Sequence, residues 1–379
     1  MEEETNLTSK FITAITVILC VALLLFLIRK IIQGPFYKKA NRIDGKVVII
    51  TGCNTGIGKQ TALELAKRGG KIYMACRDPI KCEDARLEII EKTKNENIFN
   101  RTLDLNSLKS VRTFANNFLN EESKLDILIN NAGVMATPKT LTKDGFELQF
   151  GVNHLGHFLL TNLLLDTLKK SAPSRIVIVS SAIYLFGSIN KADLNSEKNY
   201  SKVGAYAQSK LANLLFTKEL AKRLEGTNIT VNCCHPGIVR TELGRHIVAG
   251  NFKKYVTDPL SSYFFKTAEA GAQPSIKLAL DEDLKQSGGY YFDQFRMPVL
   301  SKAKDMEMAK WLWERSEELV GLKSKSVKES VTAMDVSDVD GMTVVELEVT
   351  KEEMLPKIVE KIEDVEKSSD MEKKDEEKK

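Results

Sequence analysis

Tyr206 and Lys210 place a phenol and an ammonium group four residues apart. Residues at this spacing share one face of a helix, so a helix here brings the two groups together. A phenol can give its proton to a developing alkoxide, and a nearby ammonium group stabilises the phenolate that remains. The pair alone is weak evidence, because a lysine-rich chain with nine tyrosines is expected to contain such a pair by chance. Proton transfer to a carbonyl oxygen is therefore a hypothesis that other motifs must support.

A glycine-rich turn lies far upstream of this pair. Residues 51–58 read TGCNTGIG, directly after the apolar run KVVII and before the helix-like stretch KQTALELAKRGG. Gly52, Gly56 and Gly58 allow a tight strand-to-helix turn in which backbone N–H groups and the helix N-terminus approach a pyrophosphate. The spacing GxxxGxG differs from the GxGxxG of the common dinucleotide fold. The turn predicts a bound dinucleotide.

The end of the next apolar run indicates which dinucleotide is bound. An enzyme that uses NAD places an acidic residue there, against the ribose 2′-hydroxyl, but this chain reads Ala75-Cys76-Arg77. A guanidinium group instead forms a charge-assisted pair with a 2′-phosphate. Arg77 therefore favours NADP(H), although the neighbouring Asp78 could weaken that preference.

The elements that must position these residues follow an alternating pattern over residues 44–322. Short apolar runs alternate with longer amphipathic stretches, and the runs read KVVII, KIYMAC, IFNRTLDL, LDILINNAG, RIVIVSS and ITVNCCHPG. They are continuous rather than alternating in polarity, which is typical of parallel strands covered by helices on both faces. The pattern predicts an α/β fold, a single doubly wound Rossmann-type parallel sheet domain that ends with a helix near Leu322.

Taken together and in this order, the motifs resemble the short-chain dehydrogenase/reductase family. Within the family, the segments GCNTGIGKQTALELAKRG, GVNHLGHFLLTNLLL, AYAQSKLANLLFTKELAKRL and HPGIVRTEL are similar to the microsomal retinol dehydrogenase group. The resemblance covers residues 44–322, and the long charged tail after Leu322 departs from the group. It implies an NADP(H)-dependent oxidoreductase with no metal.

The resemblance also implies roles for particular residues. The catalytic residues would be Asn153, Ser181, Tyr206 and Lys210, with Ser181 and Tyr206 also contacting the substrate. The cofactor would be held by Gly52, Asn54, Thr55, Gly56, Ile57, Gly58, Arg77, Asp104, Asn131, Ala132, Gly133, Tyr206, Lys210, Pro236, Gly237, Ile238 and Thr241. In the family the asparagine bends a helix and holds a water beside the lysine.

Coulombic magnitudes give Lys210 a further expected role. At about 4 Å and an effective dielectric constant of 20, its charge would stabilise the Tyr206 phenolate by roughly 4 kcal/mol, enough to lower the tyrosine pKa by about 3 units.

The interval from Ser181 to Tyr206 is longer than the family usually shows, and such an insert also occurs in the retinol dehydrogenase branch. His154, His157 and His235 are interpreted as packing or surface residues.

The substrate is expected to be small and lipophilic. Residues 244–274 lie where the family places its substrate lid, and the apolar residues there suit a lipid-like molecule. Reduction of retinal to retinol is the first expectation; steroids and fatty or lipid-peroxidation aldehydes fit the same features. A hypothesis from a different class is a membrane-tethered scaffold that retains an inactive dehydrogenase fold.

The N-terminal end is expected to anchor the chain in a membrane. Residues 11–28 carry no charge and, as a helix, span roughly 27 Å, close to the thickness of a bilayer's hydrocarbon. The short segment 1–10 is acidic and the linker 29–43 is basic, so the positive-inside rule places the catalytic domain in the cytosol. We expect a single-pass anchor in the endoplasmic reticulum; a lipid-droplet or mitochondrial membrane, or a hairpin in one leaflet, are alternatives.

Charge is divided unevenly along the chain. From Val331 to the end the net charge is −8, and the preceding residues carry +12 without a basic stripe, which disfavours a nucleic acid partner. The tail 323–379 is polar and expected to be largely disordered. Apolar residues at spacings of three and four predict a short amphipathic helix at 354–366, which leaves open a protein partner for the tail. A homodimer is also left open.

Overall fold

The computed structural model describes residues 2–241, 243 and 263–323. The chain divides into two compact units, Met1–Ser324 and Lys325–Lys379. The second unit, with the helix predicted at 354–366, lies outside the described residues. The first contains the helix α1 and the α/β domain.

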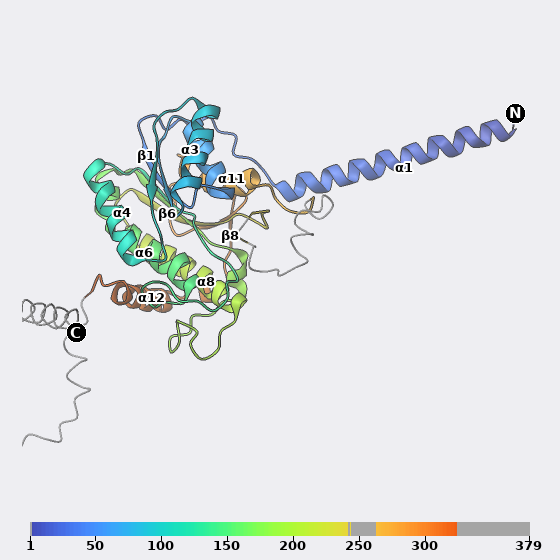
Figure 1. Cartoon of the computed structure of the whole chain (residues 1–379). Helices are drawn as coiled ribbons and strands as arrows, with labels where there is room; N and C mark the ends of the chain where they lie inside the picture. The colour runs from blue at the N-terminus through green and yellow to red at the C-terminus, as the bar shows by residue number, and fades with distance from the viewer. Residues whose placement is uncertain (1, 242, 244–262, 324–379) are drawn as a thin grey trace, which may run out of the picture. The chain divides into compact units, whose positions relative to one another are not determined.

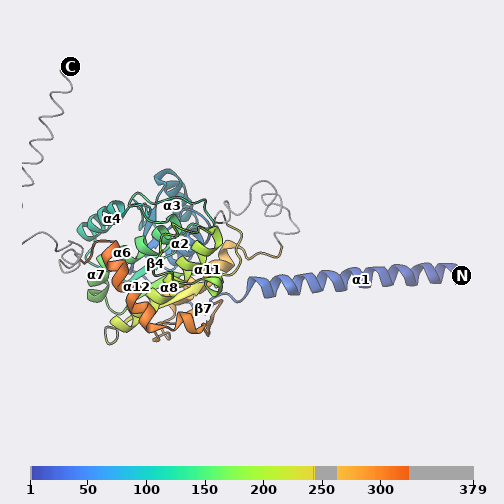
Figure 2. The same ribbon diagram turned by 90° about the horizontal axis from the view of Figure 1, so that it is seen from below.

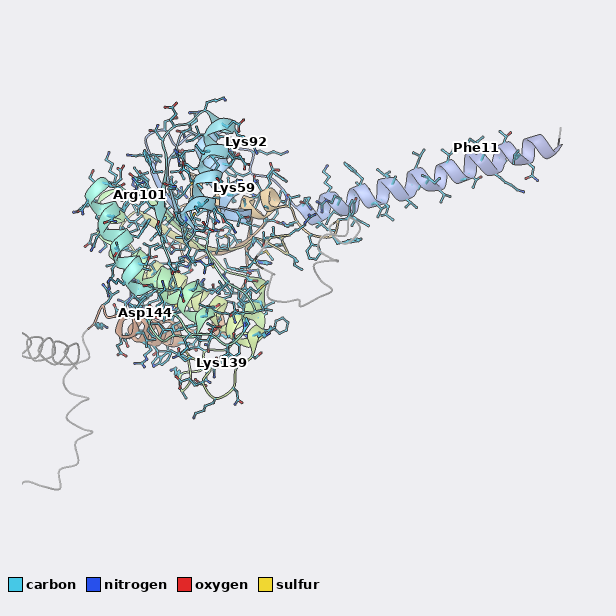
Figure 3. All side chains as sticks on the ribbon, in the orientation of Figure 1. Phe11, Lys59, Lys92, Arg101, Lys139 and Asp144 are labelled. Carbon is cyan, nitrogen blue, oxygen red and sulfur yellow. The ribbon has the colours of Figure 1, made fainter. Side chains whose placement is uncertain are left out.

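Helix α1 runs from Glu2 to Gln33 and is longer than the predicted span of residues 11–28. Its most apolar window has a mean hydropathy of 3.1 and none of that window is buried, so its length and composition allow it to cross a membrane. Phe11 projects from this helix and is exposed (Figure 3). The helix stops where Gly34 adopts a positive φ and Pro35 follows, because proline cannot continue a helix.

An eight-stranded sheet forms the centre of the domain, in the order β3-β2-β1-β4-β5-β6-β7-β8 (Figure 1). The strands are β1 Val47–Thr51, β2 Lys71–Cys76, β3 Ile98–Thr102, β4 Ile127–Asn130, β5 Ser174–Val179, β6 Ile229–His235, β7 Tyr290–Phe292 and β8 Phe295–Met297. Neighbours pair in parallel except β7 with β8. The strand order reverses between β1 and β4, and in such folds ligands bind at the carboxyl ends of the strands beside this reversal.

Helices cover both faces of the sheet (Figures 1 and 2). On one face lie α2 Gly56–Lys67, α3 Pro79–Thr93 and α11 Ala268–Leu280. On the other lie α4 Leu108–Glu121, α6 Gly156–Leu163, α7 Leu165–Lys170, α8 Lys202–Arg223 and α12 Met306–Leu319. Short helical turns complete the domain: α5 Leu148–Phe150, η1 Gly151–Leu155, η2 Ala182–Phe186 and η4 Ser301–Ala303.

Strand β1 shows why the apolar runs fold as they do. Val47 and Ile49 belong to the core on the α8 side, whereas Val48 and Ile50 belong to the core on the α2 side. Successive side chains of a strand point to opposite faces, so a strand buried on both faces must be apolar throughout. The doubly wound parallel sheet predicted from the sequence is confirmed, apart from its last antiparallel pair.

Two features differ from the sequence predictions. The edge strands β7 and β8 were not expected, because each has only three residues and β8 is exposed, so neither gives an apolar run. The predicted lid at 244–274 is wrong for its last part: residues from Ala268 onward form α11, which packs on α2. Its small residues Ala270, Gly271 and Ala272 are buried there. Residues 244–262 of that prediction lie outside the described residues.

Candidate active site

The glycine turn between β1 and α2 is built so that the backbone itself is exposed to a ligand. Gly52 and Gly56 have positive φ values of 64° and 57°, which favour glycine. A Cβ on Gly58 would lie 2.4 Å from the Gly52 carbonyl oxygen, so a side chain cannot be accommodated there without a shift. The N-cap residue Thr55 makes no side-chain capping bond, which leaves the first N–H groups of α2 without that partner.

The end of β4 holds this turn in place. The Asn131 side-chain amide donates to the carbonyl oxygens of Thr51 and Gly52, at 2.8 and 3.1 Å. The Thr51 hydroxyl oxygen accepts from the backbone N–H groups of Asn131 and Ala132, both at 2.9 Å. His157 Nε2 lies 2.8 Å from the same hydroxyl oxygen. The predicted residues of β1, β4 and the turn therefore form one hydrogen-bonded unit.

Helix α8 carries Tyr206 and Lys210, both buried. Ser181 caps the turn η2 and hydrogen-bonds with the Tyr206 phenol. The Lys210 Nζ donates to the Val179 carbonyl oxygen at 3.1 Å and lies 5.6 Å from the centre of the Tyr206 ring. The Ser180 hydroxyl donates to the Lys210 carbonyl oxygen at 2.8 Å, which fixes α8 against the end of β5.

Asn153 joins α8 to the end of β4 from a π-helical turn, η1. Its Nδ2 donates to the Val134 carbonyl oxygen at 3.0 Å and to Ser209 Oγ at 2.9 Å, and its Oδ1 accepts from the Val134 N–H at 2.8 Å. A Cβ on Gly133 would lie 3.1 Å from Asn153 Oδ1 and 3.7 Å from Lys210 Nζ, so both polar groups surround this glycine. A π-helical turn inside a helix often marks a functional position.

Burial determines the protonation of these groups. It lowers the pKa of Lys210 to about 8, because a charge is costly away from water. It raises the pKa of the Tyr206 phenol, and the hydrogen bond with Ser181 acts in the opposite direction. Desolvation of the phenolate therefore acts against the expected lowering of the tyrosine pKa by Lys210, and that lowering stays a prediction.

The carboxyl ends of the strands surround a cavity of about 690 Å³. Ten of the residues predicted from the sequence line it: Ile57, Asn131, Gly133, Ser181, Tyr206, Lys210, Pro236, Gly237, Ile238 and Thr241. The predicted residues that do not line it are Gly52, Asn54, Thr55, Gly56, Gly58, Arg77, Asp104, Ala132 and Asn153. Apart from Arg77, Asp104 and the η1 residue Asn153, these belong to the glycine turn or to the β4 end just described.

Arg77 and Asp104 lie at the ends of β2 and β3. Arg77 is exposed, and its side chain makes no hydrogen bond or ion pair with the described residues. Asp78 beside it caps α3, accepting the N–H groups of Ile80 and Lys81 at 3.1 Å. The Asp104 carboxylate accepts from the Asn106 N–H and pairs with Lys143 at 3.1 Å. Of these charged groups, Arg77 alone is a cation without an ion-pair partner among the described residues. It can therefore bind an anion at the end of β2.

Several cavity residues were missed by sequence reasoning. Leu185, Phe186 and Phe292 line the apolar part, and none lies in a motif that marks it; Phe265, which also lines it, lies in the segment 244–274 that was predicted as a substrate lid. His235 was interpreted as a packing residue, and it does stack on Phe292, but it also lines the cavity. Burial lowers the pKa of His235 to about 4, so the imidazole is neutral at physiological pH.

His154 and His157 are packing residues, as expected. His154 lies in the core, 2.9 Å from the Ser316 hydroxyl. His157 is buried and contacts the Thr51 hydroxyl and the Asn153 carbonyl oxygen. It therefore helps to hold these two site residues and does not line the cavity.

Comparison with known proteins gives consistent matches. A family model for short chain dehydrogenases matches residues 46–251. Retinol dehydrogenase 13 of Homo sapiens is 50% identical over 325 residues, which cover 85% of this chain and 98% of the relative. Retinol dehydrogenase 12 of Mus musculus is 52% identical over 296 residues, 78% of this chain and 92% of the relative. The family model covers the strands β1 to β6.

Solved structures agree on the fold. A crystal structure of an uncharacterized protein from Mycobacterium paratuberculosis is 39% identical, with a TM-score of 0.60 over 76% of this chain and 98% of that one. A short chain dehydrogenase from Escherichia coli CFT073 is 23% identical, with a TM-score of 0.55 over 68% of this chain and 100% of that one. The second is a likeness of fold alone.

Proposed function

Because the chain belongs to the short-chain dehydrogenase/reductase family and to its retinol dehydrogenase group, we propose that it is a membrane-anchored NADP(H)-dependent reductase of apolar aldehydes or ketones. Its catalytic domain would be residues 44–322 and its first substrate retinal, reduced to retinol. One observation carries the proposal: a largely apolar cavity contains Ser181, Tyr206 and Lys210 in its wall, beside the glycine turn that begins α2.

The residues present fit a dinucleotide. The glycine turn offers a cradle that a Cβ on Gly58 would fill, and the uncapped N-terminus of α2 favours a phosphate group. Family members use NAD(H) or NADP(H). When bound, the cofactor supplies the hydride, and the protein supplies binding, orientation and the proton.

Arg77 supports NADP(H) over NAD(H). Its guanidinium group is exposed and without a partner among the described residues, at the strand end where a 2′-phosphate would lie. The sequence indicated that Asp78 could weaken the preference for NADP(H). Its carboxylate already accepts hydrogen bonds from two backbone N–H groups at the start of α3, which reduces this effect.

The proton would come from Tyr206. Its raised pKa keeps the phenol protonated at physiological pH, which suits a general acid that protonates an alkoxide. Ser181 would donate a hydrogen bond to the substrate oxygen, and the Lys210 ammonium would stabilise the phenolate formed after transfer. Asn153 holds Ser209 and the Val134 backbone, and so positions the helix that carries both groups.

The cavity and the relatives support the substrate class. Apolar side chains from η2, the loop after β6 and β7 surround the polar groups, as expected for a lipophilic substrate with one reactive oxygen. The relatives named retinol dehydrogenase support a retinoid. A steroid ketone or a fatty aldehyde shares this chemistry.

A substrate panel tests the function. The full chain in detergent micelles, supplied with NADPH, should reduce retinal with a higher kcat/KM than a steroid ketone or a long-chain alkyl aldehyde. A steroid ketone reduced fastest would replace the substrate class and keep the reaction. If the folded protein binds NADPH and reduces no carbonyl compound, the proposed reaction is wrong.

The proposed location rests on α1 and on the charges that flank it. We place it across the endoplasmic reticulum membrane with the basic linker 29–43 and the domain in the cytosol, on the basis of the charges that flank the span. Protease added to sealed microsomes should digest the domain without detergent. Full protection would put the domain in the lumen and reverse this orientation.

A further inference from the structure

The end of the proposed membrane span is hydrogen-bonded to one short segment of the domain, residues 263–267. Arg29 Nη1 donates to the carbonyl oxygens of Tyr263 and Phe265, at 2.5 and 2.6 Å. The Gln33 amide donates to the Phe265 carbonyl oxygen at 3.1 Å and accepts from the Thr267 N–H at 2.9 Å. The last turns of α1 therefore pair with the backbone of this segment.

The opposite edge of the same segment forms part of the cavity wall. The Lys266 N–H donates to the Ile238 carbonyl oxygen at 2.9 Å, and the Arg240 N–H donates to the Lys266 carbonyl oxygen at 3.1 Å. Ile238, Arg240 and Phe265 all line the cavity. Paired strands lie about 4.8 Å apart, so the cavity wall is roughly one strand width from the end of the span. A bilayer that holds α1 must have its surface close to the cavity.

The rim of the cavity is apolar and exposed, unlike the usual surface of a folded domain. Phe186 is 78% exposed and Ile238 is 72% exposed, although both line the cavity. Leu185 and Val203 are also exposed and line it, and the exposed Phe264 precedes the cavity residue Phe265. We call Leu185, Phe186, Val203, Ile238 and Phe264 the rim.

The charged residues beside the rim are positive, and anionic lipid headgroups attract positive charge. Arg240 lines the cavity and is exposed next to Ile238, and Lys202 is exposed next to Val203. Cations beside apolar side chains are typical of surfaces that insert into the interfacial region of a bilayer with anionic lipids. The rim therefore combines the two features that favour a membrane surface.

We propose that the rim inserts into the interfacial region of the same bilayer that α1 spans, so that the cavity opens toward the membrane and an apolar substrate enters from the lipid. The occupant of this surface is a phospholipid bilayer. The proposal rests on the membrane span of the proposed function and not on the identity of the substrate.

Quenching by brominated phospholipids tests this proposal in the full chain. Single substitutions to tryptophan are placed in the span (Phe26→Trp), on the rim (Phe186→Trp) and on the far edge of the domain (Leu119→Trp), in vesicles that contain anionic lipid. Leu119 is exposed near the end of α4, which runs back to the amino ends of the strands, away from the cavity. The native Trp311 and Trp313 give the same background in each variant.

The expected result is strong quenching of the added tryptophan at Phe26 and Phe186 and little at Leu119. Quenching at Phe26 alone would overturn the rim proposal while leaving the span in place. Absence of quenching at Phe26 would overturn the span and the rim proposal together. Equal quenching at Phe186 and Leu119 would show nonspecific contact with lipid and would also overturn it. None of these outcomes depends on whether the protein reduces retinal.

Discussion

Burial shifts the pKa values of Tyr206 and Lys210 in opposite directions, and both shifts affect the proposed reduction reaction. Burial raises the pKa of the phenol and lowers the pKa of the lysine to about 8. The Tyr206 phenol is therefore protonated at physiological pH and can transfer its proton to an alkoxide. The lowered pKa of Lys210 lies close to physiological pH. Reduction requires the phenol protonated and the ammonium charged, so it should be favoured on the acidic side of this pKa.

The first prediction is a pH profile. As pH rises through about 8, Lys210 loses its charge, and kcat/KM for NADPH-dependent reduction should fall with a midpoint near that pH. Tyr206 should not contribute to this fall, because its pKa is raised rather than lowered. The profile is measured by steady-state kinetics; constant activity up to pH 10 would contradict the role given to Lys210.

Stability should change in the opposite sense, which separates this loss of activity from unfolding. The unfolded chain still binds the proton between the lowered pKa of about 8 and the ordinary value of 10.5, so deprotonation of Lys210 favours the folded state as pH rises. Relative to Lys210→Met, the wild-type protein should gain roughly 3 kcal/mol of unfolding free energy over this range. Denaturant titrations of both proteins at each pH measure the difference.

The second prediction concerns cofactor choice at Arg77. Arg77→Ala should lower the preference for NADPH over NADH by about 10- to 100-fold, because one charge-assisted contact contributes roughly 1.5–3 kcal/mol. Arg101→Ala is the matched control, since this arginine on the adjacent β3 already pairs with Glu121. The ratio of kcat/KM values with the two cofactors gives the answer. An unchanged ratio in Arg77→Ala would remove this arginine from cofactor recognition.

At this scale the sequence predicted the polar groups and missed most of the apolar side chains that line the cavity, with Ile57, Pro236 and Ile238 as exceptions. Tyr206, Lys210, Ser181 and Asn131 lie in short motifs whose spacing has a chemical meaning. Phe186 and Phe292 occupy ordinary positions in the chain, and only the folding of η2 and β7 around the cavity brings them there. The raised pKa of Tyr206 could not be predicted from the sequence either, because it depends on how completely the phenol is buried.

At the scale of elements, the turn between β1 and α2 depends on how closely the backbone approaches itself. Gly58→Ala would place a methyl group 2.4 Å from the Gly52 carbonyl oxygen and 2.5 Å from Asn131 Nδ2. We expect it to cost about 1–3 kcal/mol of unfolding free energy, as overpacking does, and to weaken NADPH binding at least tenfold.

Gly226→Ala is the control for this third prediction. Gly226 has a φ of 81° and no atom near its added methyl group, so the substitution carries backbone strain without a clash. It should cost roughly 1 kcal/mol and leave NADPH binding unchanged. Chemical denaturation and cofactor titration of both variants measure the two quantities. If Gly58→Ala binds NADPH normally, the turn is not the phosphate cradle.

The central strands and their helices were predictable because strands buried on both faces need continuous apolar runs. The closing helix α12 was also predicted, but the part of the domain between β6 and α12 was harder to predict. Residues from Ala268 to Leu280 form α11 because small residues allow close packing on α2, a tertiary contact that no local pattern specifies. Strands β7 and β8 are short and form at the sheet edge, where pairing with β6 supplies the hydrogen bonds.

At the scale of the whole molecule, the end of α1 and the α/β domain are in direct contact. Arg29 and Gln33 bind the backbone of residues 263–267, and Lys266 in that segment pairs with Asp293 between β7 and β8. Helix α1 therefore contacts the segment beside the cavity. With the proposed orientation and the proposed insertion of the rim, NADPH would reach the site from the cytosol and a lipophilic substrate would reach it from the bilayer.

The most direct test of this account measures retinal reduction in sealed microsomes that contain the full chain, with NADPH supplied outside. Tyr206→Phe keeps the ring and its packing and removes only the hydroxyl that must protonate the alkoxide. We predict that NADPH binding survives and that turnover falls by about 10² to 10⁴, the range typical of general acid catalysis. Near-normal retinal reduction by Tyr206→Phe would mean that the proton comes from another group, and would contradict the assignment of the active site.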